Sequence, residues 1–202
     1  MNRDSHSEPK LKTRLRAETA RVITAAAEEV FAAKGLHDAK VEEIAARAGV
    51  SVGTVYNHFE DRDGLLQALI EGRRQQLAIR LDAVLDEVKS EPFPLQLRRF
   101  ATTVLEHFEA HREFLAITLQ CDSASLAQPS EAMREVKARV EALVRRGVEQ
   151  RALRALGQEL WATLLLGSVR AVLVHELRNP GRLPVGERAS AIVDFFLYGA
   201  GA

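Results

Sequence analysis

The sequence predicts an all-α protein in which a three-helix head is joined by one long helix to a larger helical body. Aliphatic residues and alanine supply most of the 47% hydrophobic content, whereas aromatic residues make up only 5% of the chain. Glycine and proline are few, and such a composition favours helices. Apolar residues recur at the spacing of helices, and no strand pattern rises above background.

Positive charge gathers near the N-terminus. Lys+Arg and Asp+Glu balance at 28 each, so any electrostatic argument must be local. Residues 1–12 are expected to form a disordered basic arm, and their polar character is not that of a signal peptide. Residues 10–21 carry five positive charges against Glu18 alone. The first helix is expected in "RAETARVITAAAEEVFAAKG", with Gly35 just past its C-terminus.

Residues 13–60 are expected to form one domain that contains a helix-turn-helix, "VEEIAARAGVSVGTVYNHF". Gly49 tolerates the positive φ that the turn needs, and Ala45 is small enough for the closest approach of two helices. Ser51 is available as the N-cap of the second helix. Val55 and Phe59 pin that helix to the head, which leaves its other side chains facing outward.

The outward residues of this second helix are better suited to contact with DNA than to simple exposure to water. A merely solvated helix would favour Lys, Glu and Gln, none of which occurs here. Thr54 can meet a base edge or a thymine methyl, Val52 can make apolar contact, and Gly53 lets the backbone come close. The donors expected to reach phosphate oxygens are Tyr56, Asn57 and His58. The pattern predicts a helix that enters a major groove, with a generic α-turn-α as the alternative.

A long connecting helix is expected over 61–90, capped by Asp61, with Arg62 placing a cation at a helix N-terminus suited to phosphate. Pro92 and Pro94 then mark the clearest break in the chain. Beyond it, the body of residues 91–202 is expected to contain helices near 96–110, 112–120, 130–154, 157–178 and 186–199.

Residues 14–70 resemble the DNA-binding head of the TetR (tetracycline repressor) family of transcriptional regulators. The matching segments are "ITAAAEEVFAAKG", "VEEIAARAGVSVGTVYNHF" and "LLQALI". The resemblance implies a homodimer on a palindromic double-stranded DNA operator, with repression relieved when a small molecule binds the body. It also places Val52, Gly53 and Thr54 at base-facing positions. The phosphate-contacting positions that it implies are Tyr56, His58 and Arg62.

Two departures from the family pattern bear on DNA binding. Ala39 and Lys40 stand where the family usually has a Thr pair, so a capping hydroxyl is lost and Lys40 is expected to replace the phosphate contact. Glu60 stands where the family commonly has a Lys. With Asp61 and Asp63 beside it, local attraction to phosphate is weakened, and we expect modest affinity with strong salt dependence.

The body offers candidate ligand-binding and dimer-forming residues, each of which could instead be ordinary core. An apolar cavity with a few polar handles would suit a small, largely apolar ligand. The candidate ligand-binding residues are Phe100, His107, Phe108, His111, Phe114, Thr118, Cys121 and Trp161. By the resemblance, the last two helices form a four-helix interface between two copies. The candidate interface residues are Leu164, Ser168, Ala171, Val172, His175, Ile192, Phe195, Phe196 and Gly199.

Other classes of protein are disfavoured. A metal enzyme using Glu106, His107, Glu109 and His111 would need Glu-x-x-His motifs on paired helices, and this sequence contains none. No phosphate-binding glycine loop or nucleophile elbow occurs, so neither catalysis, a metal nor a cofactor is expected. A single cysteine fits a reducing cytoplasm, and no membrane partner is expected because Arg170 interrupts the longest apolar stretch. A ligand-independent architectural DNA-binding protein remains the alternative.

Overall fold

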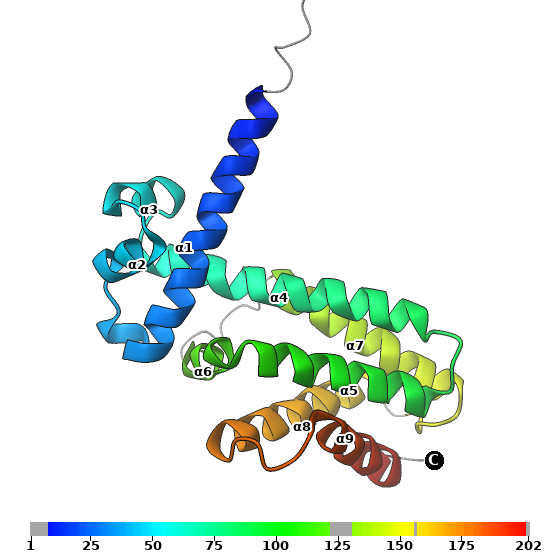
Figure 1. The fold of residues 1–202 in the computed structure, drawn as a ribbon. Coiled ribbons are helices and arrows are strands. Elements are labelled where there is room, and N and C mark those ends of the chain that lie inside the picture. The colour runs from blue at the N-terminus through cyan, green and yellow to red at the C-terminus, as the bar shows by residue number, and fades with distance from the viewer. Residues whose placement is uncertain (1–7, 122–130, 156, 201–202) are drawn as a thin grey trace, which may run out of the picture. The chain divides into compact units, whose positions relative to one another are not determined.

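The computed structural model describes residues 8–121, 131–155 and 157–200, and within them it contains nine α-helices and no strand. The all-α prediction is therefore confirmed. The chain divides into two compact units, residues 1–70 and residues 71–202. Figure 1 labels the helices in chain order. The boundary falls inside one long helix, so the expected connecting segment 61–90 is shared between the units rather than separate from both.

The first unit contains α1 (Glu8–Asp38), α2 (Val41–Ala48), α3 (Val52–His58) and the start of α4 (Arg62–Glu87). Residues 8–12 are helical, which corrects the expectation of a disordered arm there; residues 1–7 lie outside the described part. Gly35 has φ +81 within the last turns of α1, so the backbone leaves helical geometry at the predicted glycine.

The core of the first unit brings together apolar residues from all four of these helices. Its side chains are buried because each helix turns one apolar stripe inward. The fully buried members include Ile23, Ala27, Phe31, Ile44 and Leu65. At the surface, Lys34 reaches Glu43 at 2.5 Å and lowers the pKa of that carboxyl, chiefly through the hydrogen bond. Figure 1 shows α2 lying against α1 and α3 following it.

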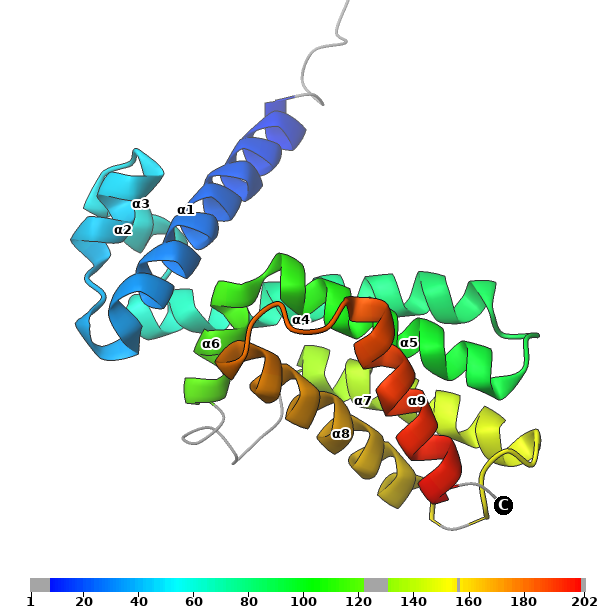
Figure 2. The same cartoon turned by 60° about the horizontal axis from the view of Figure 1, so that its bottom comes forward.

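The second unit contains the rest of α4 and five further helices. These are α5 (Phe93–Ala110), α6 (Arg112–Cys121), α7 (Glu131–Glu149), α8 (Gln158–Arg178) and α9 (Val185–Ala200). Figure 2 shows α9 crossing α5 and running beside α8. One continuous apolar core joins α4, α5, α7, α8 and α9, and α6 contributes Leu115 to it.

Helix α7 ends at Glu149, five residues before the predicted end. Arg151 takes a left-handed φ of +58, and the N–H groups of Ala152 and Leu153 donate to the carbonyl of Gly147. This turn buries Leu153 in the core. The apolar periodicity predicted a helix that continues to residue 154, but burial of the Leu153 side chain in the core favours a turn at this place.

Candidate nucleic-acid interface and ligand cavity

The turn between α2 and α3 has the geometry that its sequence predicted. Gly49 lies in the left-handed region at φ +68, ψ +29, and the N–H of Val50 donates to the carbonyl of Ala45 at 3.0 Å. Ser51 caps α3: its Oγ accepts a hydrogen bond from the N–H of Thr54 at 3.1 Å. Ala45 is buried, as expected of a residue at the closest approach of two helices.

Helix α3 buries only Val55 and presents polar side chains outward. Tyr56 is 49% exposed, and Asn57 and Gly53 are exposed. Val52, Thr54 and His58 are half-buried, with the Thr54 Oγ1 lying 2.8 Å from the Ser51 Oγ. The predicted base-facing and phosphate-facing residues are thus gathered on one short helix, and their contacts with DNA stay predictions.

Arg16 anchors the end of α3, a role that sequence reasoning missed. Its Nη2 donates to the carbonyl of Asn57 at 3.2 Å. The C-terminal end of a helix carries partial negative charge, so a cation at this place is stabilising. The sequence marks Arg16 only as one of several basic residues. The contact joins positions 41 residues apart and therefore becomes visible only in the folded unit.

Arg62 is engaged by the end of α1. Its Nη1 donates to the carbonyl of Leu36 at 2.8 Å, and its Nη2 lies 3.0 Å from the Asp63 carboxylate. These bonds compete with the predicted phosphate contact. Asp61 accepts a hydrogen bond from the N–H of Gly64 at 2.7 Å, which confirms that it caps α4.

The residue that precedes α2 also behaves as its sequence indicated. Lys40 is the N-cap residue of α2 and makes no side-chain capping bond, as expected when Lys replaces a hydroxyl residue. Its side chain is exposed.

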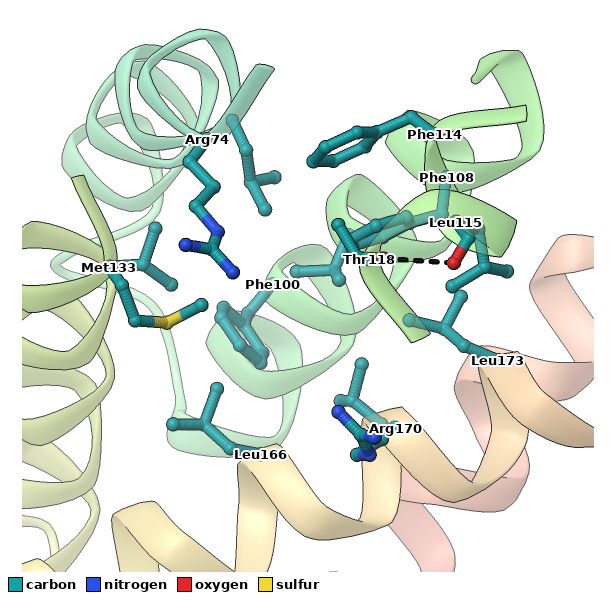
Figure 3. Close-up of a pocket in the computed structure, with 14 residues that line it drawn as sticks. Arg74, Phe100, Phe108, Phe114, Leu115, Thr118, Met133, Leu166, Arg170 and Leu173 are labelled. Carbon is teal, nitrogen blue, oxygen red and sulfur yellow. Dashed lines mark hydrogen bonds between the residues drawn. The ribbon is translucent and has the colours of Figure 1, made fainter. Parts of the chain in front are cut away.

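The second unit encloses a cavity of about 210 Å³ between α4, α5, α6, α7 and α8 (Figure 3). Four predicted ligand residues line it: Phe100, Phe108, Phe114 and Thr118. The rings of Phe108 and Phe114 stack at 5.7 Å between centroids. The other lining residues are Arg74, Leu77, Val104, Leu115, Met133, Val136, Leu166, Val169, Arg170 and Leu173.

Three of the predicted ligand residues lie away from the cavity wall. Trp161 is core: its Nε1 donates to the carbonyl of Arg154, and its ring meets Phe196 edge-on. His107 is fully buried behind the wall, 6.4 Å from the Phe114 ring, and His111 is half-buried with its Nε2 3.4 Å from an Arg73 guanidinium nitrogen. The side chain of Cys121, the remaining candidate, lies outside the described residues.

Burial is the largest cause of the lowered pKa of His107. Desolvation, followed by the charges of His111 and two arginines, lowers its pKa from 6.5 to about 4. Within the described part of the chain, its Nε2 has no hydrogen-bond partner. The imidazole is therefore neutral at physiological pH. No cluster of three or more His, Cys, Asp or Glu side chains able to hold a metal occurs among the described residues.

Helices α8 and α9 leave large apolar side chains in solvent. Their exposed fractions are 53% for Leu160, 46% for Leu164, 67% for Phe195 and 88% for Tyr198. Over Glu159–Arg178, α8 is long and apolar enough to cross a membrane by length and composition alone, a test that helices of soluble proteins also pass. An apolar face of this kind is typical of a protein–protein contact.

Part of the predicted dimer set needs correction. Ile192 and Phe196 are each only 2% exposed and belong to the core of the second unit, so their side chains cannot meet a second copy. Of the rest, Leu164, Ala171, His175 and Phe195 are exposed, and Ser168 and Val172 are half-buried. The surroundings of Gly199 lie outside the described residues.

Comparison with known proteins shows what the head is similar to. The sequence pattern of "Bacterial regulatory proteins, tetR family" matches residues 23–69, which include α2 and α3. The HTH-type transcriptional regulator BetI of Escherichia coli O127:H6 is 39% identical over 75 residues, 37% of either chain. The HTH-type transcriptional repressor BepR of Brucella suis biovar 1 is 33% identical over 134 residues, 63% of either chain. The chain thus matches less than two thirds of the length of these relatives.

Solved structures extend the likeness of fold to both units. The transcriptional regulator FadR of Bacillus subtilis, in complex with stearoyl-CoA, aligns with a TM-score of 0.76 at 18% identity, over 89% of this chain and 98% of its own. A tetR-family regulator of Shewanella sp. PV-4 aligns with a TM-score of 0.72 at 21% identity, over 91% of this chain and 98% of its own. The family pattern in the head is that of regulatory proteins, which agrees with the expectation that the chain is no enzyme. Residues 23–69, the head of the chain, therefore match the TetR family of transcriptional regulators.

Proposed function

We propose that this protein is a homodimeric, DNA-binding transcriptional repressor that releases its operator when a small, largely apolar molecule occupies the second unit. The observation that carries the proposal is the outer surface of α3, where exposed Tyr56 and Asn57 accompany Thr54 on a helix that begins after a left-handed glycine turn. That turn lets the N-terminal half of a second helix enter a major groove.

The length and the chemistry of each side chain on α3 suit it to contact either bases or phosphates. Thr54 is short and sits in the first turn, and its methyl and hydroxyl suit a base edge. Tyr56 and His58 can donate to phosphate oxygens, which positions the protein without reading sequence. The bond from Arg16 to the Asn57 carbonyl supports this surface, because it holds the C-terminal end of α3 to α1.

Dimerisation is supported by the exposed apolar side chains of α8 and α9. Covering Leu164, Phe195 and Tyr198 with the same face of a second copy would remove apolar surface from water. A dimer also presents two heads, which a palindromic operator requires. We place the protein in the cytoplasm, where its DNA target lies.

Repression and its relief are supported by the relatives and by the cavity. BepR bears the name of a repressor, and FadR of Bacillus subtilis was crystallised with stearoyl-CoA. In this chain the aromatic wall formed by Phe100, Phe108 and Phe114 suits an apolar ligand. A ligand-independent architectural protein, the second candidate function, would have no need of such a cavity.

The decisive experiment measures binding of the purified full-length chain to its own upstream DNA by fluorescence anisotropy. We expect a dimer to bind that fragment and an unrelated fragment to compete poorly at physiological salt. Equal affinity for both fragments would overturn the sequence-specific repressor. A protein that binds specifically but whose melting temperature responds to no compound in a broad library would favour the architectural alternative.

A further inference from the structure

We infer that the N-terminal part of α1 is a second DNA-contacting element, in which Lys12 binds a backbone phosphate beside the end of α3. This inference rests on the proposed function, because it takes DNA as the partner of the head. It goes further, because it assigns an electrostatic contact to a helix that lies outside the helix-turn-helix, on a residue that the sequence pattern of the head does not mark.

Most of the positive charge around the helix-turn-helix is already compensated inside the first unit. Arg62 lies 3.0 Å from the Asp63 carboxylate and also donates to the carbonyl of Leu36. An anion that approaches such a side chain meets a negative charge as well as a positive one, so the net attraction is small. The other ion pairs among the described residues of this unit join Arg21 to Glu18, Lys34 to Glu43 and Arg47 to Glu29.

Uncompensated positive charge gathers instead on the N-terminal part of α1. Lys12 and Arg14 are exposed, and neither forms an ion pair within the part of the chain that the structure describes. Arg16 donates to the carbonyl of Asn57, a neutral acceptor that leaves the positive charge in place. Residues 9–17 contain no Asp or Glu. An anion therefore meets three positive charges here and no carboxylate between them.

The helical period places Lys12 on the face of α1 that is turned towards the rest of the unit. Residues four apart lie one above another on a helix, so Lys12, Arg16 and the half-buried Ala20 share one face. Three residues further on, this face includes Ile23, which is fully buried in the core. Figures 1 and 2 show that α1 continues past α3. Lys12 thus lies one turn beyond the contact between Arg16 and the end of α3.

A phosphate backbone is the partner that fits this arrangement. On α3, Tyr56 and His58 are proposed to donate to phosphate oxygens, and Lys12 adds a charged donor beyond the C-terminal end of the same helix. DNA carries one negative charge for about every 1.7 Å of its axis, so a cation beside a helix in the groove meets a phosphate. Glu60 removes the Lys that the TetR family commonly has after α3, and Lys12 supplies a positive charge to this end from α1.

The salt dependence of DNA binding tests the contact. Fluorescence anisotropy with the upstream fragment compares the full-length parent with Lys12→Gln at salt concentrations from about 50 to about 200 mM. Each phosphate contact contributes about 0.9 to the slope of log K against log salt concentration, so loss of the two contacts in a dimer should reduce the slope by about 1.8. Over this fourfold range of salt, the fall in affinity should be about twelvefold smaller in the variant than in the parent.

Arg14→Gln is the matched control, because it removes the same charge two residues away on another face of α1. Arg14 shares its face with the exposed Glu18 and Arg21, which form an ion pair. This control should keep the parental slope, and so should Lys12→Arg, which retains the charge. All three variants should melt at the temperature of the parent, because the replaced side chains are exposed. A parental slope in Lys12→Gln, or an equal reduction in Lys12→Gln and Arg14→Gln, would overturn the inference.

An unrelated DNA fragment in the same titrations separates this inference from the proposed function. If the parent binds both fragments equally and Lys12→Gln reduces the slope on both, the sequence-specific repressor is wrong and the phosphate contact stands. If the parent prefers the upstream fragment and Lys12→Gln keeps the parental slope, only the phosphate contact is wrong.

Discussion

At Gly147, the addition of a single methyl group should have a large effect on the stability of the protein. An added Cβ would lie 2.7 Å from Cε2 and 2.8 Å from Cζ of Phe93, and 2.9 Å from Cδ1 of Leu153. Phe93 and Leu153 are both buried in the core of the second unit, so neither can move aside freely. Gly147→Ala therefore overpacks a core in which every neighbour is already in contact.

The expected magnitude follows from two opposing effects. Overpacking costs about 1–3 kcal/mol, and alanine gains about 1 kcal/mol over glycine inside a helix. We expect Gly147→Ala to lower the free energy of unfolding by up to about 2 kcal/mol. Gly72→Ala provides the matched control, because Gly72 lies in α4, is exposed, and has nothing within 4 Å of an added Cβ. The control should gain about 0.5–1 kcal/mol.

Equilibrium unfolding in urea, followed by circular dichroism at one fixed protein concentration, measures both variants. Opposite signs for the two glycines are the expected result. Equal stabilisation by both alanines would refute the reasoning, because it would mean that the side chains of Phe93 and Leu153 yield without cost.

The remaining predictions concern the head and the buried histidine. Arg62→Ala should lower the free energy of unfolding by about 1–2 kcal/mol, because the hydrogen bond to the Leu36 carbonyl is lost. If the variant instead binds DNA with a weaker dependence on salt concentration than the parent, Arg62 contacts a phosphate. Thr54→Ala should alter preference at particular operator positions, whereas Tyr56→Phe should weaken binding to all sequences alike. The folded pKa of His107, about 4, lies below its ordinary 6.5, so its contribution to stability is complete above pH 6.5 and is lost as pH falls towards 4. His107→Leu should flatten that dependence.

Each of these expected effects has a result that would contradict it. If Thr54→Ala and Tyr56→Phe both bind like the parent, the placement of α3 in a groove is wrong. Replacing the exposed His37 should leave the fall in stability between pH 6.5 and 4 as it is in the parent. An unchanged slope in His107→Leu would mean that carboxylates alone produce the acid sensitivity.

The head could be predicted from sequence because its determinants are local. Gly49, Ser51 and Ala45 lie within seven residues of one another, and each acts through a backbone conformation, a cap or a close approach that involves near neighbours. Local chemistry of this kind leaves a readable pattern. The same holds for Asp61, whose capping bond spans three residues.

The body could be predicted only in outline. Helix positions followed from periodicity, but α8 and α9 are apolar around much of their circumference, so the sequence could not say which face turns inward. The packing of α9 on α5 places Ile192 and Phe196 in the core and Phe195 in solvent. Tertiary packing likewise places Trp161 in the core and not in the cavity wall.

By itself, then, the sequence determined the all-α class, the helix-turn-helix and the likeness of the head to the TetR family. Only the tertiary structure decided the cavity, because Arg74, Met133 and Arg170 come from three helices far apart in the chain. An arginine within an apolar helix looks like an interruption when read along the sequence. It becomes a candidate ligand contact only when packing leaves space beside it, and that space depends on side-chain volumes contributed by five helices at once.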